Sequence, residues 1–200
     1  MDGSILRWIN RLADRTSWAH GLFRANAAYG IVLFAALLVV AYLDGRQHAD
    51  LTAVAASVWA ALAALVALGI GQIIGSAVDR ARPYETMTNV HLLVDKTTDF
   101  SFPSDHATAA GAVAIGLLFA NRRVGIVASA LAILMAFTRV YVGAHYLSDV
   151  LAGLALGGLV ATAGWFVIVP LLRRIATWLT TTPLRPLVAP APNRAVQLVG

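Results

Sequence analysis

The chain has 200 residues, of which 59% are hydrophobic and only 12% are charged. An average globular domain carries about a quarter charged residues, so this composition leaves too little polar surface for an ordinary water-soluble fold. The lack of cysteine excludes disulfide scaffolds, thiolate zinc sites and cysteine nucleophiles. The net charge is +5 and the only lysine is Lys96, so the positive charge is carried by arginine, which pairs well with phosphate.

The first segment, residues 1–24, is amphipathic and lacks the apolar core of a signal peptide. Apolar residues recur at helical spacing opposite charged ones: Ile5, Trp8, Ile9 and Leu12 against Arg7, Arg11 and Asp14. This pattern predicts a helix that lies in the headgroup plane of a membrane. A solvated amphipathic tail is the alternative.

Five uncharged stretches follow: residues 25–43, 51–78, 107–121, 124–138 and 150–172. A helix needs about 20 residues to cross the hydrocarbon core, so the first, second and fifth stretches suffice unaided. The third and fourth reach full length only if their helices continue into the polar residues beside them. We expect an all-α polytopic membrane bundle with about five transmembrane helices, and glycines such as Gly111, Gly153 and Gly157 favour close helix packing.

The last segment, residues 180–200, contains four of the seven prolines and has little periodicity. We expect an irregular C-terminal tail outside the membrane. Residues 1–179 would then form a single membrane-embedded domain, with its polar clusters within residues 79–149.

The first polar cluster runs from Asp79 to Glu85, directly after the second uncharged stretch. Arg80 and Arg82 are separated by one residue, and Pro83 stops helical continuation after them. The two guanidinium groups would face a membrane surface, where they can bind phosphate. A positive-inside anchor or contact with a lipid headgroup explains the cluster equally well.

The second cluster, Phe102 to His106, opens the third uncharged stretch. Pro103 precedes the expected helix, and Ser104 and Asp105 are residue types that cap helix N-termini. The free backbone N–H groups of such a terminus bind phosphate readily. Plain capping, with His106 as an interfacial polar residue, is the alternative.

The third cluster, Thr138 to Asp149, joins the fourth stretch to the fifth. If the last helix begins near His145, then His145 and Asp149 lie one turn apart on the same face. The carboxylate can then fix the ring tautomer and leave the other nitrogen free as a base or nucleophile. A histidine–aspartate pair of this kind is also common as a purely structural contact.

The order of the helices places all three clusters on one membrane face. The second span ends near Arg82, the third begins at His106, the fourth ends at Arg139 and the fifth begins near His145. One site with arginines, a hydroxyl and two histidines favours phosphoryl transfer to a histidine nucleophile.

Together these motifs resemble the signature of the type 2 phosphatidic acid phosphatase superfamily. The matching residues are Arg82-Pro83, then Pro103-Ser104-Asp105-His106, then Arg139 with His145 and Asp149 at spacings of six and four. The aspartate in the second motif and the run from Arg139 to Tyr146 are similar to bacterial undecaprenyl pyrophosphate phosphatases of the bacitracin-resistance type. The resemblance covers residues 72–158. Two positions depart from the family pattern: Gly75 replaces a lysine, and Thr138 replaces the usual serine.

The resemblance implies a role for each matching residue. His145 would be the nucleophile oriented by Asp149, and His106 would protonate the leaving group and later activate water. The phosphoryl oxygens would be held by Arg82 and Arg139, with Ser104 and Thr138 as hydroxyl donors. We expect Arg80 to supply the charge missing at Gly75, and Asp105 to face Arg80 or to support His106. The chemistry of the family needs no metal or other cofactor.

The implied function is hydrolysis of undecaprenyl or a related polyprenyl pyrophosphate to the monophosphate, which recycles the carrier lipid for cell-wall synthesis. A phosphatase for phosphatidic acid or phosphatidylglycerol phosphate is one alternative, and a non-enzymatic membrane scaffold or anion transporter is another. The expected partners are the lipid pyrophosphate and membrane lipids, without nucleic acid. The oligomeric state stays open.

The arginines outside the expected site predict its orientation. The face opposite the site would carry Arg46, Arg122, Arg123, Arg173 and Arg174. The positive-inside rule makes that face cytoplasmic, so we expect a multi-pass protein of the bacterial cytoplasmic (inner) membrane with an extracytoplasmic site. The N-terminal arginines oppose this orientation, although an interfacial helix can hold arginine against anionic headgroups on either leaflet.

Overall fold

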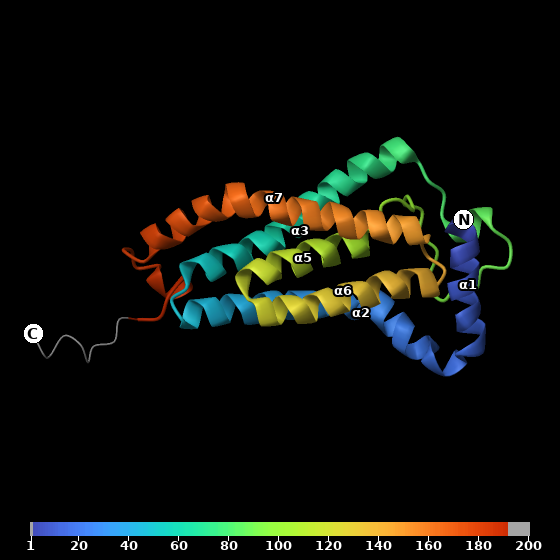
Figure 1. Cartoon of the computed structure of the whole chain (residues 1–200), viewed down its shortest axis with the longest axis horizontal. Coiled ribbons are helices and arrows are strands. Elements are labelled where there is room, and N and C mark those ends of the chain that lie inside the picture. The colour runs from blue at the N-terminus through green and yellow to red at the C-terminus, as the bar shows by residue number, and fades with distance from the viewer. Residues whose placement is uncertain (1, 192–200) are drawn as a thin grey trace, which may run out of the picture.

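The computed structural model describes residues 2–191, which form helices, turns and loops without any strand (Figure 1). The α-helices are, in chain order, α1 (Asp2–Arg15), α2 (His20–Gln47), α3 (Leu51–Val78), α4 (Pro83–Thr86), α5 (Asp105–Ala120), α6 (Arg122–Tyr141) and α7 (Leu147–Leu179). Two short 3-10 turns are η1 (Ser17–Ala19) and η2 (Arg185–Leu187). The predicted all-α class is confirmed.

The long apolar helices follow the uncharged stretches of the sequence. Four segments are long and apolar enough to cross a membrane: Ser17–Gln47, Leu51–Thr86, Arg122–Tyr141 and Leu147–Leu179. The fifth apolar helix, α5, has 16 residues, because the backbone is already extended at Ser104 before it and at Asn121 after it. The expected bundle of about five spans is therefore four long helices around one shorter helix.

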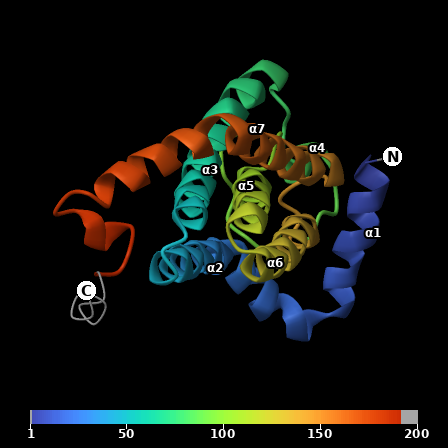
Figure 2. The ribbon, with the colours of Figure 1, turned by 60° about the vertical axis from the view of Figure 1, so that its left-hand side comes forward.

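The short helix α5 lies at the centre of the bundle, between α3, α6 and α7 (Figure 2). Glycines let the backbones of α5 and α7 touch. A Cβ atom added at Gly157 would lie 2.1 Å from the carbonyl oxygen of Thr108, and one at Gly111 would lie 2.6 Å from that of Leu154. This is the small-residue packing that helices use in lipid, where apolar burial alone gives no driving force.

Helix α1 lies across one end of the bundle (Figure 1). Its apolar residues divide between two faces: Leu6 and Ile9 are buried, whereas Trp8 is exposed. The side chain of Asn10 fixes the inward face, since it donates to the carbonyl oxygens of His91 and Tyr141 and accepts from the backbone N–H of His91. The helix ends at Arg15, so it is shorter than the helix over residues 1–24 that the sequence predicts, and its place in the headgroup plane stays a prediction.

The same end of the bundle gathers the three polar clusters. Helices α3 and α6 end there, α5 and α7 begin there, and the loop between α4 and α5 closes over it (Figure 1). Gly143 lets the chain turn from α6 to α7, because its φ of 78° lies in the left-handed region and a Cβ would lie 2.8 Å from Cγ1 of Val90.

The chain after α7 folds back onto the opposite end. The hydroxyl of Tyr42 donates to the carbonyl oxygen of Leu187, and Arg46 donates to that of Pro186. Val188 is buried by this return, and residues 180–191 consist of turns and loop with the short 3-10 turn η2. Residues 192–200 of the predicted tail lie outside the described residues.

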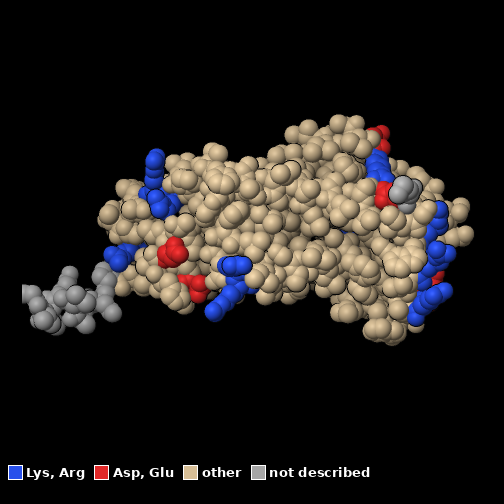
Figure 3. Space-filling model, viewed as in Figure 1, with Lys and Arg blue, Asp and Glu red and all other residues tan. Residues whose placement is uncertain are grey.

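Charged side chains follow the same division between the two ends. On the face in Figure 3 they gather toward both ends of the long axis, with a zone free of charge between them. An uncharged zone between two charged ends is the pattern that a bilayer imposes on a spanning bundle.

Candidate active site

His145 lies in the connection between α6 and α7, and its side chain is only 2% exposed. Its Nδ1 lies 2.8 Å from the carbonyl oxygen of Ser101, which can only accept, so Nδ1 carries the proton. Nε2 then holds the lone pair, to which Nη1 of Arg82 donates at 3.1 Å. Burial lowers the pKa of His145 to about 4, with the positive charges of Arg139 and Arg82 acting in the same direction. The ring is therefore neutral at pH 7, as a nucleophile requires.

Asp149 is fully buried in the first turn of α7 and accepts three close hydrogen bonds. Its donors are Nη1 of Arg80 at 2.6 Å, Oγ of Ser101 at 2.6 Å and the backbone N–H of Tyr146 at 2.9 Å. Nδ1 of His145 lies 3.7 Å away, beyond hydrogen-bond distance. The direct histidine–aspartate hydrogen bond that we expected is thus replaced by a route through Ser101, whose hydroxyl binds the carboxylate and whose carbonyl binds the ring.

Arg80 binds carboxylates of the protein, whereas we expected it to bind phosphate. Its guanidinium bonds Oδ1 of Asp149, pairs with Asp2 at 2.7 Å and lies over the ring of Tyr146 at 4.0 Å from the centroid. Burial would raise the pKa of Asp2, but hydrogen bonds from Ser148 and Arg80 hold it below its usual value. Arg80 therefore supports the buried carboxylate of Asp149 and ties α1 to the site.

Arg82 stands between α3 and α4, and its guanidinium is buried against His145. Besides its contact with Nε2, Nη1 donates to the carbonyl oxygen of Ala144 at 3.1 Å. On its other side, Nη2 pairs with Oδ2 of Asp99 at 2.9 Å. Burial would raise the pKa of Asp99, but a hydrogen bond from Thr97 and the charge of Arg82 keep it low. A loop carboxylate thus orients this arginine beside the candidate nucleophile.

Three buried polar atoms in the predicted site residues have no partner among residues 2–191. They are Oγ of Ser104, Oγ1 of Thr138 and Nε of Arg139. A buried polar atom without a hydrogen bond costs about 1–3 kcal/mol, so native proteins rarely leave three of them in one set of residues. An anion with several acceptor oxygens would satisfy such donors. Ser104 is free for this because it caps α5 by its backbone alone.

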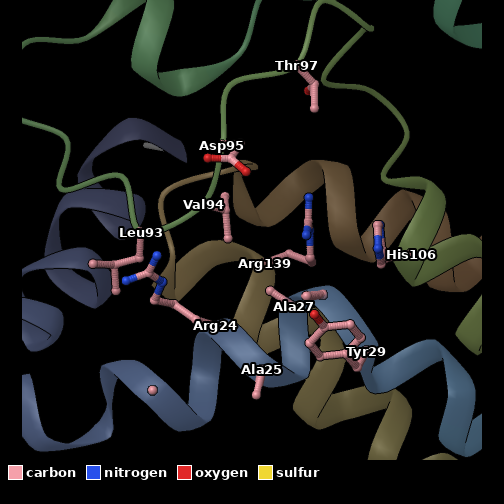
Figure 4. Close-up of a pocket in the computed structure, with 12 residues that line it drawn as sticks. Arg24, Ala25, Ala27, Tyr29, Leu93, Val94, Asp95, Thr97, His106 and Arg139 are labelled. Atoms are coloured by element: carbon pink, nitrogen blue, oxygen red, sulfur yellow. The ribbon is translucent and has the colours of Figure 1, made fainter.

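A pocket of about 570 Å³ opens beside these residues (Figure 4). His106, half-buried in the first turn of α5, lines it together with Arg139 from α6. The other walls come from α2, including Arg24 and Tyr29, and from the loop at residues 93–97. The pocket therefore joins the predicted acid–base histidine to the surface of α2.

Asp105 of α5 and Gly75 of α3 lie where α3 meets α5 and the segment before it. Asp105 accepts two hydrogen bonds from Nε2 of Gln72, at 3.1 and 3.0 Å, and does not pair with Arg80. A Cβ at Gly75 would lie 3.0 Å from the carbonyl oxygen of Phe102 and 3.2 Å from Cδ2 of Phe100. A lysine there would displace the segment that carries Ser101, which gives a steric reason for the departure from the family pattern.

The arrangement offers a neutral imidazole nitrogen, two buried guanidinium groups, a second histidine and two hydroxyls that have no partner among the described residues. These are the parts that phosphoryl transfer through a histidine needs: a nucleophile, charge stabilisation for the phosphoryl oxygens and an acid–base group. Within residues 2–191, no group of three or more histidine, aspartate or glutamate side chains could hold a metal ion.

Sequence reasoning missed four residues of this network: Ser101, Asp99, Asp2 and Gln72. Ser101 directly precedes the Phe102–His106 motif, so a motif one residue longer would have included it. Asp2 lies 78 residues from Arg80 along the chain. No spacing rule relates two residues that far apart.

Comparisons with known proteins match most of the chain. A family model described as the PAP2 superfamily matches residues 56–173. Undecaprenyl-diphosphatase BcrC of Bacillus subtilis is 32% identical over 158 residues, which are 77% of each chain. Lipid A 1-phosphatase of Rhizobium etli is 57% identical over 60 residues, 29% of this chain and 25% of that protein. In fold, the chain is similar to a PAP2-type phosphatidylglycerolphosphate phosphatase of Bacillus subtilis, with a TM-score of 0.60, 21% identity and 81% coverage of each chain.

Proposed function

The chain belongs to the PAP2 superfamily as a multi-pass membrane phosphatase, and we propose that it removes the terminal phosphate of undecaprenyl or a related polyprenyl diphosphate. The observation that carries the chemistry is the neutral Nε2 of His145 beside Arg82, in a site where Ser104 and Arg139 hold buried polar atoms that have no partner among the described residues. The choice of a prenyl diphosphate is supported by the undecaprenyl-diphosphatase relative, which aligns with 77% of the chain.

In the first step, Nε2 of His145 attacks the terminal phosphorus and forms an N–P bond. Arg82 transfers its hydrogen bond from Nε2 to a phosphoryl oxygen, and Arg139 and Ser104 hold the others. The bond from phosphorus to the bridging oxygen breaks, and its electron pair stays on that oxygen, which His106 protonates. Burial and the charge of Arg139 lower the pKa of the free His106 to about 4, so His106 must take up this proton when the anionic substrate binds beside it. The positive charge that develops on the imidazole is stabilised by the Ser101 carbonyl and by Asp149.

In the second step, a water oxygen attacks the phosphohistidine while its proton passes to His106. The N–P electron pair returns to Nε2, and inorganic phosphate leaves. The sum is hydrolysis of one phosphoanhydride bond, with the lipid monophosphate as the other product. No step needs a metal ion, because the two arginines neutralise the charge of the transferred group.

Hydrolysis of a lipid phosphate monoester is the second candidate activity. The segment that matches lipid A 1-phosphatase is 57% identical to it, although it spans only 60 residues. The nucleophile and the arginines would serve both substrates. The two candidates differ in the leaving group, which is a phosphate for the diphosphate and an alcohol or sugar oxygen for the monoester.

The test is phosphate release by purified protein in neutral detergent. We expect faster turnover of undecaprenyl diphosphate than of phosphatidic acid or phosphatidylglycerol phosphate. His145→Ala should lower kcat by about a thousandfold or more, because the covalent route is lost. The matched control is His48→Ala, an exposed histidine at the opposite end of the bundle. Equal activity of His145→Ala and His48→Ala would contradict the mechanism. Faster turnover of a lipid monoester than of undecaprenyl diphosphate would contradict the proposed substrate.

We also propose that the site opens on the extracytoplasmic side of the bacterial cytoplasmic membrane, where it would recycle the carrier lipid for cell-wall synthesis. The proposal is supported by the arginines at the other end, which lie at the α5–α6 turn and near the end of α7. These positions suit a cytoplasmic face by the positive-inside rule.

A further inference from the structure

A second cation, besides Arg139, lines the pocket that contains His106. Arg24, in the second turn of α2, lies in the wall of the pocket whose other residues include His106 and Arg139 (Figure 4). Its side chain is exposed and makes no hydrogen bond or ion pair within residues 2–191. Arg24 is thus a free guanidinium in the same cavity as the acid–base histidine, and the mechanism above does not use it.

The chemistry fixes which part of a substrate occupies this cavity. The transferred phosphorus must lie beside Nε2 of His145, and the oxygen that leaves must lie within reach of His106. Atoms beyond the breaking bond therefore continue past His106 into the pocket that His106 lines. In a lipid diphosphate the first such group is the inner phosphate, which is negatively charged before the reaction and shares the charge that develops on the bridging oxygen until His106 protonates that oxygen.

The wall of α2 around Arg24 suits such a group. Gly21, Arg24, Ala25 and Ala28 recur at helical spacing on the pocket side, so small residues flank the cation and leave room for a phosphate. Tyr29 also lines the pocket and is exposed, as are residues farther along α2 such as Val32, so the cavity continues onto an apolar helix surface. Asp95 is the carboxylate that lines the pocket, and Figure 4 places it on the loop side, opposite α2.

We propose that Arg24 binds the inner phosphate of a lipid diphosphate and makes the enzyme selective for diphosphates over lipid monophosphates. This inference rests on the proposed function, because it concerns the leaving group of that reaction. The N–P bond forms at the terminal phosphorus, the P–O bond to the bridging oxygen breaks, and the electron pair adds charge to the inner phosphate. Arg24 stabilises that charge by charge-assisted hydrogen bonds. A lipid monophosphate has no anion at this position and gains nothing from the cation.

The experiment compares farnesyl diphosphate with farnesyl monophosphate, which share one short prenyl chain. Both are assayed in neutral detergent, so that contact of Arg24 with anionic lipid headgroups cannot contribute. We expect Arg24→Gln to lower kcat/KM for the diphosphate by at least about tenfold relative to that for the monophosphate, the effect of losing one charged hydrogen-bond partner. Arg24→Lys should recover part of the ratio, because it keeps the charge but loses the bidentate geometry.

Arg11→Gln is the matched control, since Arg11 is an exposed arginine on α1 that lines a separate hollow. Arg11→Gln should leave the ratio of kcat/KM for the diphosphate to kcat/KM for the monophosphate as it is in the unmodified protein. An equal fall for both substrates in Arg24→Gln would assign Arg24 a structural role and overturn the inference while the proposed function stands. Failure of the unmodified protein to hydrolyse farnesyl or undecaprenyl diphosphate would instead overturn the proposed function.

Discussion

Two arginines of the site carry the same charge but differ in what surrounds them. Arg80 is bonded to Asp149, Ser148 and Asp2. Arg139 is 8% exposed, and its Nε has no partner among the described residues. A paired arginine that compensates a buried carboxylate stabilises the fold, whereas a buried arginine with a free donor costs folding free energy and can bind an anion.

This difference predicts opposite consequences for the same substitution. Arg80→Gln should lower the free energy of unfolding by about 3 kcal/mol, because it leaves the buried charge of Asp149 uncompensated. Arg139→Gln should leave stability unchanged or slightly raised, yet abolish measurable turnover. Thermal unfolding and phosphate release, measured on both variants in one detergent, check the pair. Stability loss in Arg139→Gln with none in Arg80→Gln would reverse the two assignments.

At the scale of elements, the site depends on how closely α7 approaches α5. Ser104 and Thr108 of the α5 end lie against Gly153 of α7, where an added Cβ would be 2.7 Å from the carbonyl oxygen of Ser104. His106 comes from α5, and Asp149 comes from α7. The distance between these two helices therefore sets the geometry between His106, the proposed acid–base group, and the network that orients His145, the proposed nucleophile.

Gly157→Ala tests this packing directly. The new Cβ would lie 2.1 Å from the carbonyl oxygen of Thr108, so the helices must separate, and we expect a loss of about 1–3 kcal/mol in stability. Gly69→Ala in α3 is the control, because nothing lies within 4 Å of its added Cβ. Unfolding temperatures of the two variants give the measurement. Equal temperatures would mean that the two helices are not held in backbone contact.

At the scale of the whole molecule, the bundle has two chemically different ends. One end holds the site under α1 and the long loop, and the other holds the turns between α2 and α3 and between α5 and α6 (Figure 1). Because the long helices run between these ends, the protein can be inserted with the site on only one side of the membrane. The side determines whether the proposed substrate, a lipid diphosphate, would reach the site from inside the cell or from outside.

Single cysteines at the two ends report this orientation, and the chain has no native cysteine to interfere. We expect Thr98→Cys, in the exposed loop over the site, to react with a membrane-impermeant thiol reagent in intact cells. Gln47→Cys, exposed at the end of α2, should react only after the membrane is opened. Neither substitution removes a charge, so the positive-inside balance is preserved. The reverse labelling pattern would place the site in the cytoplasm.

The sequence by itself determined the membrane class, the helical architecture and the meeting of three polar clusters at one end. These follow from local composition, because each span depends on its own uncharged length and alternating spans return the chain to the same face. The sequence also marked His145, His106, Arg82, Arg139 and Ser104 through their motifs, and the structure brings them to one end around the pocket and the buried imidazole.

Only the tertiary structure decided which polar side chains form hydrogen bonds and ion pairs with one another. In the structure Arg80 binds Asp2 and Asp149, Ser101 lies between Asp149 and His145, and Nε of Arg139 has no partner within residues 2–191. The tertiary structure also ended α5 after 16 residues and brought Arg24 of α2 to the pocket. These hydrogen bonds join residues that lie between 44 and 78 positions apart in the sequence. Their choice depends on helix packing distances and on which charges become buried together, and no local pattern encodes either.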